Sequence, residues 1–262
     1  MIAAAALALV AAYPLSAWFP EPTDARVASL LGFLLAMVPA ALFMAGILRA
    51  PLPPRLLGLI VVLGLALGFL AAYLEMPALA APFKIAAAAA AGRLLGVHVP
   101  GPRWLAFMAG LVLLIDAWSV FFGPTKAIVE ATPSLLEYLL VVFPSAGGSV
   151  GAALGVTDFV FLAFFTVGSA ITGLRHRLGF TLMAASFPVS LGLAMGLERG
   201  LPALPLLGLA FLLANADLLA SRGGTRRKPP SAPTPATGPT APTGPIPPAG
   251  STTPAVPTDS KK

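Results

Sequence analysis

The chain has 262 residues, of which 58% are hydrophobic and 10% are charged, and its mean hydropathy is +0.91. This composition excludes an ordinary soluble protein, because apolar runs of about 20 residues recur and that length spans a bilayer. The net charge of +6 lies in short loops and in the C-terminal tail, which favours a role in membrane topology over nucleic-acid binding. Cysteine is absent and only two histidines are present, so we expect neither disulfides nor a zinc site.

About eight apolar segments follow one another along the chain, each long enough to cross a bilayer as a helix. They lack the alternation of polar and apolar residues found in the strands of a membrane barrel. The first lacks the basic start of a signal peptide, and we expect it to be retained. The predicted fold is therefore all-α, a polytopic helical membrane protein. The expected helices cover residues 2–19, 27–48, 56–74, 78–97, 104–122, 150–174, 178–197 and 201–219.

Basic residues alternate with these segments. The chain after the second, fourth, sixth and eighth segments is basic, whereas the other loops are acidic or balanced. By the positive-inside rule, this pattern places both termini in the cytoplasm. The basic residues are Arg49, Arg55, Arg93, His98, Arg103, Arg175, His176, Arg177, Arg222, Arg226, Arg227 and Lys228.

The fourth segment is the least typical, because it is rich in alanine and contains Lys84 and Arg93. The alternation of basic loops nevertheless requires this fourth segment to cross the membrane. We expect Lys84 and Arg93 to extend along the helix towards opposite interfaces; a half-buried or re-entrant helix is the alternative.

The stretch between the fifth and sixth segments contains a short apolar run, residues 134–143, between two prolines. Ser134 and Glu137 have the spacing of a capping box, which predicts the start of a helix. A helix of about ten residues is too short to cross a bilayer. We expect it either to lie on the membrane interface or to form a lid beside the two aspartates described next.

Two aspartates, Asp116 and Asp158, lie within the fifth and sixth apolar segments. An ionised carboxylate in hydrocarbon costs several kcal/mol, so such residues are rare and usually functional. Asp116 stands about six residues before the expected outer end of its helix and Asp158 about eight residues after that of its own. Both would therefore lie roughly 9–12 Å below the outer surface.

Two neighbouring carboxylates in a low dielectric share one proton and titrate as a coupled pair. The ionised member can take a proton from water while the protonated member polarises a peptide carbonyl, as in an aspartic protease. This chemistry needs no metal and no cofactor. Two alternatives remain on spacing alone: a proton- or cation-coupled transporter, which should show internal repeat symmetry that we do not find, and a structural role.

The surroundings of both aspartates resemble the presenilin and signal peptide peptidase family of intramembrane aspartyl proteases. Family members carry Tyr-Asp, Gly-x-Gly-Asp and Pro-Ala-Leu motifs in this order. Here Ile115-Asp116 stands at the first motif, Gly155-Val156-Thr157-Asp158 at the second and Pro202-Ala203-Leu204 at the third. The resemblance covers roughly residues 104–219, and the preceding segments match only as hydrophobic helices.

Two residues depart from the family pattern. Ile115 replaces the tyrosine, and Thr157 replaces the second glycine. A threonine narrows the approach of a substrate backbone, or offers its hydroxyl to Asp158. The glycine-rich residues 147–155 leave room for an unwound substrate or allow close helix packing.

The resemblance implies specific roles. Asp116 and Asp158 would be the catalytic dyad, and no metal or cofactor would take part. The substrates would be single transmembrane helices with a cytoplasmic amino end, such as leftover signal peptides; a family member that binds such helices without cutting them is an alternative. The family usually has nine spans, so one amino-terminal helix would be missing here. The implied substrate-binding residues are Gly155, Val156, Thr157, Pro202, Ala203 and Leu204.

The chain thus divides into three predicted parts. Residues 1–103 form the amino-terminal helices, residues 104–220 the catalytic helices, and residues 221–262 a disordered cytoplasmic tail rich in Pro, Ala and Thr. The expected partners are transmembrane-helix substrates and the lipid bilayer, with no nucleic acid. The Ala-, Gly- and Pro-heavy composition favours a prokaryote, and so the plasma membrane; the oligomeric state stays open.

Overall fold

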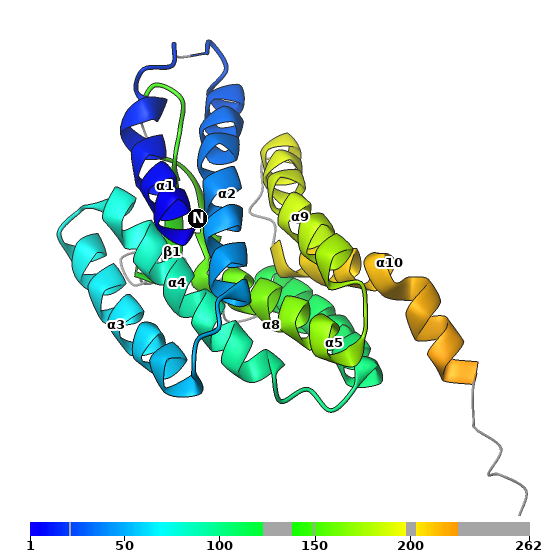
Figure 1. Ribbon diagram of the computed structural model, residues 1–262. Helices are drawn as coiled ribbons and strands as arrows, with labels where there is room; N and C mark the ends of the chain where they lie inside the picture. Colours follow the sequence, from blue (N-terminus) through cyan, green and yellow to red (C-terminus); the bar gives the residue numbers. More distant parts are fainter. Residues whose placement is uncertain (21, 123–137, 149, 198–202, 225–262) are drawn as a thin grey trace, which may run out of the picture. The chain divides into compact units, whose positions relative to one another are not determined.

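A computed structural model describes residues 1–20, 22–122, 138–148, 150–197 and 203–224. Residues 1–224 form one compact unit. The last helix includes residues 221–224, which were expected to belong to the tail, and residues 225–262 lie outside the described residues. The described chain consists of eight helices and one two-stranded sheet (Figure 1). The elements are α1 (Ile2–Ser16), α2 (Ala25–Arg49), α3 (Pro54–Tyr73), α4 (Pro77–Gly96), α5 (Pro102–Phe122), β1 (Leu140–Pro144), β2 (Val150–Gly155), α8 (Val156–Thr172), α9 (His176–Leu197) and α10 (Ala203–Gly224).

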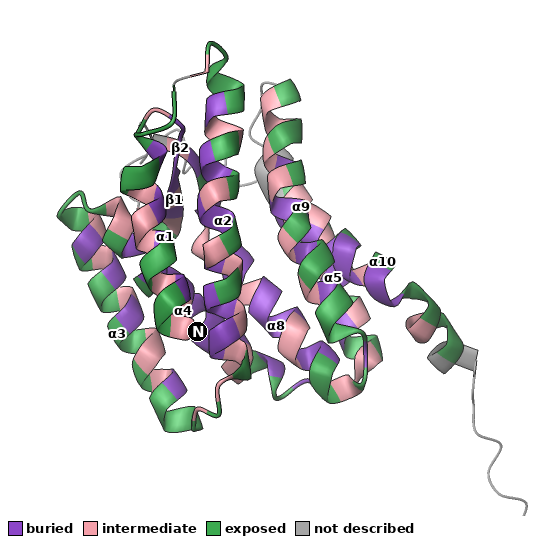
Figure 2. Cartoon of the chain, turned by 45° about the horizontal axis from the view of Figure 1, so that its top comes forward, coloured by how far each residue is buried: buried purple, intermediate pink, exposed green. Residues whose placement is uncertain are grey.

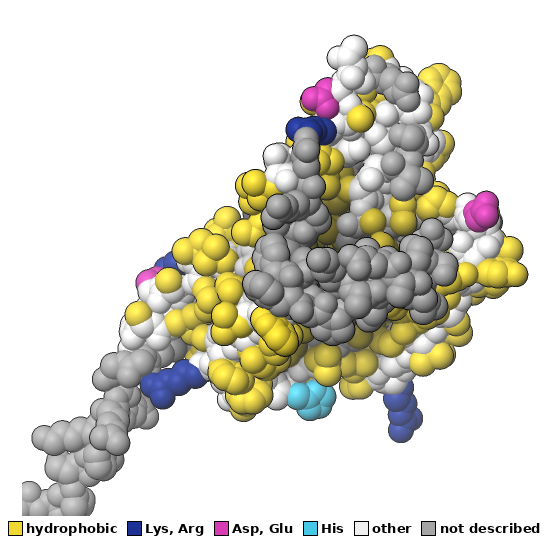
Figure 3. All heavy atoms as spheres, turned by 180° about the vertical axis from the view of Figure 1, so that it is seen from behind, with side chains coloured by type: hydrophobic (Ala, Val, Ile, Leu, Met, Phe, Trp, Pro, Cys, Tyr) yellow, Lys and Arg dark blue, Asp and Glu magenta, His cyan; other side chains and the backbone are white. Residues whose placement is uncertain are grey.

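Within the described ranges, five helices are long and apolar enough to cross a membrane: α2, α3, α4, α9 and most of α10. Helices α1 and α8 are apolar but shorter, with 15 and 17 residues. Large apolar side chains lie on the outer surface, such as Val62, Leu114 and Leu213, which are 65%, 67% and 66% exposed. Charged side chains stand at the margins of the face in Figure 3. The predicted class, a helical membrane protein, agrees with these features, and the number of crossings stays a prediction.

Hydrogen bonds show which helix ends lie together. Nη1 of Arg93, near the end of α4, donates to the carbonyls of Ile47 and Ala50 at the end of α2, at 2.9 and 2.6 Å. The N–H of Arg175, which follows α8, donates to Asn215 Oδ1 in the second half of α10 at 2.8 Å. A cavity lined by residues from the end of α2 and the start of α9 joins these groups. We call this region, with Arg49, Arg93 and residues 175–177, the basic end.

The turn of the β-hairpin lies against the other end of α2. The N–H of Gly147 donates to the carbonyl of Ser16 at the end of α1, and the N–H of Ala146 donates to that of Ala28 at the start of α2, both at 2.9 Å. The end of α1 and the hairpin turn thus lie at the start of α2, whereas the end of α4 lies at the end of α2. The orientation of the helices in a membrane stays a prediction.

The hairpin itself corrects the predicted fold. The helix expected over residues 134–143 is wrong in its last part, because β1 begins at Leu140; residues 123–137 lie outside the described residues. The sixth helix begins at Val156, not at residue 150. Strand β1, Leu-Val-Val-Phe-Pro, is rich in β-branched and aromatic residues, and β2 contains glycines that disfavour a helix. Gly147 and Gly148 form the turn with φ of 90° and 84°, which glycine adopts without strain.

The alanine-rich helix α4 lies at the centre of the structure and packs on both α3 and α8 (Figure 1). Small side chains let these backbones approach closely. A Cβ added to Gly92 of α4 would stand 2.3 Å from the carbonyl oxygen of Val160 in α8. Figure 2 shows α3 exposed over most of its outer side, so α4 and not α3 is the buried member of this pair. The fourth predicted segment is therefore a continuous helix of 20 residues.

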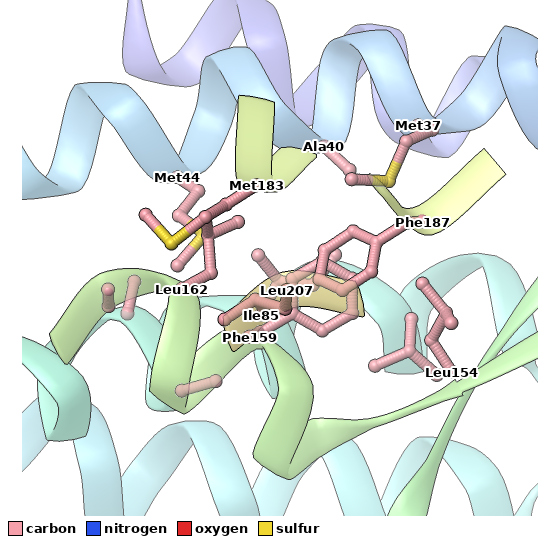
Figure 4. Packing of buried hydrophobic residues seen from close by; sticks show 14 of the residues in the cluster. Met37, Ala40, Met44, Ile85, Leu154, Phe159, Leu162, Met183, Phe187 and Leu207 are labelled. Carbon is pink, nitrogen blue, oxygen red and sulfur yellow. The ribbon is translucent and has the colours of Figure 1, made fainter. Parts of the chain in front are cut away.

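The apolar core lies where α2, α4, α8, α9 and α10 meet. The side chains labelled in Figure 4 come from these five helices and from β2, and the core also includes residues of α1, α5 and β1. Phe143 of β1 contacts Phe33 and Phe159 with ring centroids 4.9 and 6.4 Å apart, and Phe159 contacts Phe187 at 5.5 Å. This chain of aromatic rings ties the hairpin to α2 and to the first turn of α8, which carries Asp158. The labelled core residues are Met37, Ala40, Met44, Ile85, Leu154, Phe159, Leu162, Met183, Phe187 and Leu207.

Candidate functional site

Asp158 is the third residue of α8 and is buried, with 7% of its surface exposed. Its Oδ2 accepts a hydrogen bond of 3.0 Å from the N–H of Gly155, the residue that caps the helix. The expectation that Asp158 lies about eight residues inside a helix is therefore wrong. Because a strand rises about 3.3 Å per residue, β2 separates Asp158 from the hairpin turn at Gly147 and Gly148. A carboxylate at this position also stabilises the helix start.

Asp116 lies on α5, six residues before its last residue, Phe122, and is half-buried. Its carboxylate accepts a hydrogen bond from the backbone N–H of Leu204 in the first turn of α10. It also interacts electrostatically with the carboxylate of Asp158. Residues far apart in the sequence thus meet in one place, which we call the aspartate site: Asp116, Asp158 and the first turn of α10.

The other predicted site residues lie near these two carboxylates or beside them in the chain. Ala203 and Leu204 are buried at the start of α10, whereas Pro202 lies outside the described residues. Thr157 is exposed, and within the described part of the chain no hydrogen bond joins its hydroxyl to Asp158. Its predicted narrowing of the substrate approach stays untested.

Gly155 is held closely by its neighbours. A Cβ at Gly155 would stand 3.1 Å from Thr157 Oγ1 and 3.3 Å from Asp158 Oδ2. A side chain here would therefore press on the Asp158 carboxylate, which explains why glycine suits this position. Val156 follows as the first, partly buried residue of α8 and packs against the core.

The outer edge of β1 is occupied by two side chains. Nζ of Lys84, from α4, donates to the carbonyl of Leu140 at 2.7 Å, and the hydroxyl of Tyr13, from α1, donates to that of Val142. Lys84 is 2% exposed, so the expectation that it extends towards a membrane interface is wrong. A buried amine needs an acceptor, and the edge of a strand offers one. Sequence reasoning missed Tyr13 as a contributor and misjudged Lys84, although a lysine in an apolar segment was the available signal.

The outer edge of β2 is different. Val142 pairs with Ala153, and Leu140 pairs with Gly155. In an antiparallel sheet, two residues that lie directly opposite each other behave alike. The N–H and C=O of both residues point either towards the partner strand or away from it. Since the carbonyls of Leu140 and Val142 point away from β2, the backbone groups of Ala153 and Gly155 point away from β1. The hydrogen bond from Gly155 to Asp158 agrees with this direction.

The open edge of β2 therefore leads directly to a carboxylate. Ala153 is exposed, whereas its neighbours Ala152 and Leu154 are buried against the core. Among the described residues no partner of the Ala153 N–H or C=O outside the hairpin is found, and Asp158 stands at the end of the same edge. The described residues contain no group of three His, Cys, Asp or Glu side chains placed to hold a metal ion.

A comparison of the chain with protein-family models, with curated proteins and with solved structures finds no match. The fold and the site define the molecule at the level of a class. It is a mostly helical protein with apolar helices that can span a membrane, and it holds two interacting carboxylates beside an open strand edge.

Proposed function

We propose that this chain is an intramembrane aspartyl protease that hydrolyses peptide bonds within transmembrane helices, with Asp116 and Asp158 as its dyad. The observation that carries the proposal is that these two carboxylates, which lie on different helices, are near enough to interact electrostatically. A capping role accounts for Asp158 alone, but it gives no reason for a second acid to face it. The hydrogen bond from Leu204 to Asp116 adds support, because it brings the Pro-Ala-Leu segment to the same site.

Substrate binding is the first requirement of this chemistry. A transmembrane helix hides its carbonyls in internal hydrogen bonds, so a scissile bond must be unwound before water can attack it. An extended substrate can regain main-chain hydrogen bonds by pairing with the edge of a sheet. The open edge of β2 at Ala153 offers these groups and leads towards Asp158. The other edge of the hairpin is blocked by Lys84 and Tyr13.

The proposed reaction proceeds by acid–base catalysis with the dyad holding one proton. The ionised carboxylate takes a proton from water while the water oxygen bonds to the scissile carbonyl carbon, and the protonated carboxyl gives its proton to the carbonyl oxygen. The resulting gem-diol then collapses: the C–N bond breaks, the nitrogen receives a proton, and a carboxylic acid and an amine leave. Either aspartate can take either part in this scheme.

The substrate class follows from the predicted topology. The charge alternation directs α5 outward and α8 inward, so the carboxylates lie nearer the outer leaflet. Together with the resemblance to signal peptide peptidase, this orientation favours single transmembrane helices whose amino end is cytoplasmic. In a prokaryotic plasma membrane, remnants of signal peptides fit this description.

The decisive experiment incubates the purified full-length protein with synthetic transmembrane peptides and detects fragments by mass spectrometry. Asp158→Asn and Asp116→Asn are the informative variants, because an asparagine oxygen still accepts the N–H of Gly155 or Leu204 but cannot ionise. We expect each to reduce cleavage by at least about 10²-fold, the usual scale of acid–base catalysis. Asp217→Asn is the matched control, since this acid is exposed and lies far along α10.

Three results would contradict the proposal. One is an absence of fragments from wild type with several peptides. The second is cleavage retained in either asparagine variant, which would leave the aspartates with a structural role. The third is peptide binding without cleavage in the wild type, which would indicate a family member that holds helices without cutting them.

A further inference from the structure

A cavity of about 380 Å³ lies at the other end of α8 from Asp158. It is bounded by the end of α2, the second half of α8 and the start of α9. Its ionisable lining is Arg49, His176 and Arg177, and no acidic side chain among the described residues lines it. A cavity with two guanidinium groups and no carboxylate is suited to an anion.

The hydrogen-bond donors in this cavity can be assigned. The hydroxyls of Thr166 and Thr181 also line it, but they donate to the carbonyls of Leu162 and Arg177, at 2.6 and 3.1 Å. The donors left for a ligand are therefore on Arg49, His176 and Arg177. Planar guanidinium groups bind two oxygens of a phosphate at once, which favours a phosphate over a halide or a single carboxylate oxygen.

The neighbouring Arg175 provides a contrast within the same loop. It donates to Asp217 at 2.7 Å, in an ion pair on the surface, and does not line the cavity. Asp217 thus neutralises Arg175. Among the described residues, no such ion pair is found for Arg49 and Arg177, which line the cavity.

The rest of the cavity wall is apolar. Leu48 of α2, Val167 of α8 and Phe180 of α9 lie beside the basic groups. Both α2 and α9 are long and apolar enough to span a membrane, and the basic residues lie at their adjoining ends. One part of the cavity wall is basic and the rest is apolar. A ligand that carries both a phosphate and an acyl chain therefore fits the cavity better than a free phosphate. Basic pockets between helices at the cytoplasmic surface bind anionic lipid headgroups by the same chemistry.

We propose that this cavity binds the headgroup of an anionic phospholipid, with Arg49 and Arg177 on the phosphate oxygens and the acyl chain along Leu48, Val167 and Phe180. The site is separate from the aspartate site and does not depend on the proposed protease activity. A lipid bound here contacts α2, α8 and α9 together. It therefore stabilises the folded protein, by an amount that rises with the logarithm of the lipid concentration above its Kd.

The test uses the full-length protein in a neutral detergent with added phosphatidylglycerol, phosphatidylcholine or inorganic phosphate. Native mass spectrometry counts bound lipid, and the unfolding temperature reports stabilisation. We expect phosphatidylglycerol to be retained and to raise the unfolding temperature more than the other two. The variant R49Q/R177Q should weaken this binding by about tenfold or more, as expected for two lost basic contacts. R55Q is the matched control, because Arg55 is exposed and does not line the cavity.

The proposal fails if R49Q/R177Q binds phosphatidylglycerol as well as R55Q does. It also fails if phosphatidylcholine is retained equally, which would indicate a general lipid coat, or if inorganic phosphate alone gives the same stabilisation. Size-exclusion chromatography and circular dichroism check that the variants fold. Should the double variant not fold, the single variants R49Q and R177Q carry the same comparison, and the wild-type preference among the three ligands decides independently.

Discussion

The aspartate site and the basic end contain the same kinds of charged group in opposite surroundings. At the aspartate site and the adjoining hairpin, Asp158 and Lys84 are buried and each bonds to the protein backbone. At the basic end, Arg49 and Arg177 are exposed, and Arg175 pairs with Asp217 on the surface. The two regions lie at opposite ends of α8, a helix of 17 residues. Burial therefore separates Asp158 and Lys84 from the exposed arginines, while Arg93, which is partly buried, also bonds to the backbone.

This difference separates two uses of charge in a membrane protein. A buried polar group costs several kcal/mol unless it is paired, so it is retained where it shapes a strand edge or a reactive site. An exposed charge at a helix end costs little, and it sets orientation and attracts anionic lipids. Substitutions of the buried, paired groups should therefore destabilise the protein more than substitutions of the exposed charges.

The largest effect on stability is expected where α2 meets the hairpin. A Cβ at Gly32 would stand 2.3 Å from the carbonyl oxygen of Pro144, so Gly32→Ala must push the hairpin away from α2. We expect a loss of about 2–3 kcal/mol, the usual scale of overpacking. Unfolding of the detergent-solubilised protein, followed by tryptophan fluorescence, measures it. Gly192→Ala is the control, since a Cβ at Gly192 of α9 meets nothing within 4 Å; equal losses in both variants would refute the close contact.

Removing the amine that blocks β1 should have the next largest effect. Lys84→Met keeps the length of the side chain but leaves the Leu140 carbonyl without this donor. We expect hydrogen exchange of the β1 amides to rise by about tenfold, which corresponds to about 1.4 kcal/mol. Tyr13→Phe should give a smaller rise confined to the region of Val142.

Mass spectrometry of peptic peptides covering residues 138–148 measures the exchange rates. Arg93→Met is the matched control, because Arg93 also donates to backbone carbonyls but at the end of α2. Unchanged exchange in Lys84→Met, or an equal rise in Arg93→Met, would mean that Lys84 does not secure this strand edge.

At the basic end, loss of the buried Asn215 amide should destabilise the protein more than loss of the exposed ion pair between Arg175 and Asp217. Asn215 is fully buried, and its Oδ1 accepts the N–H of Arg175. We expect Asn215→Ala to destabilise the protein by about 1–2 kcal/mol, because a backbone donor loses its partner. The same fluorescence-detected unfolding measures the change.

The smallest effect belongs to the ion pair itself. The side chains of Arg175 and Asp217 are 49% and 57% exposed, and surface pairs of this kind contribute about 0–1 kcal/mol. Asp217→Asn should therefore change stability by less than about 0.5 kcal/mol, and added salt should remove even that difference. If Asp217→Asn proved as harmful as Asn215→Ala, burial would not be what separates the two groups.

Much of the fold could be predicted because helix formation is largely local. Apolar length located eight segments, seven of which coincide closely with described helices, including the alanine-rich α4. The two aspartates could be singled out from their apolar neighbours alone. The start of α8 could not be located this way, because the apolar run continues without a break through β2.

The sequence by itself determined the apolar helices, the grouping of their ends and the two acids that interrupt the apolar runs, because these depend on residues close together in the chain. Tertiary structure decided the rest. The β-hairpin required a partner strand, Lys84 required the carbonyl of Leu140, and Asp116 required the N–H of Leu204. Each of these polar groups chooses its partner across the packed interior, where an unpaired group is costly. No local pattern specifies which distant backbone atom will be within reach.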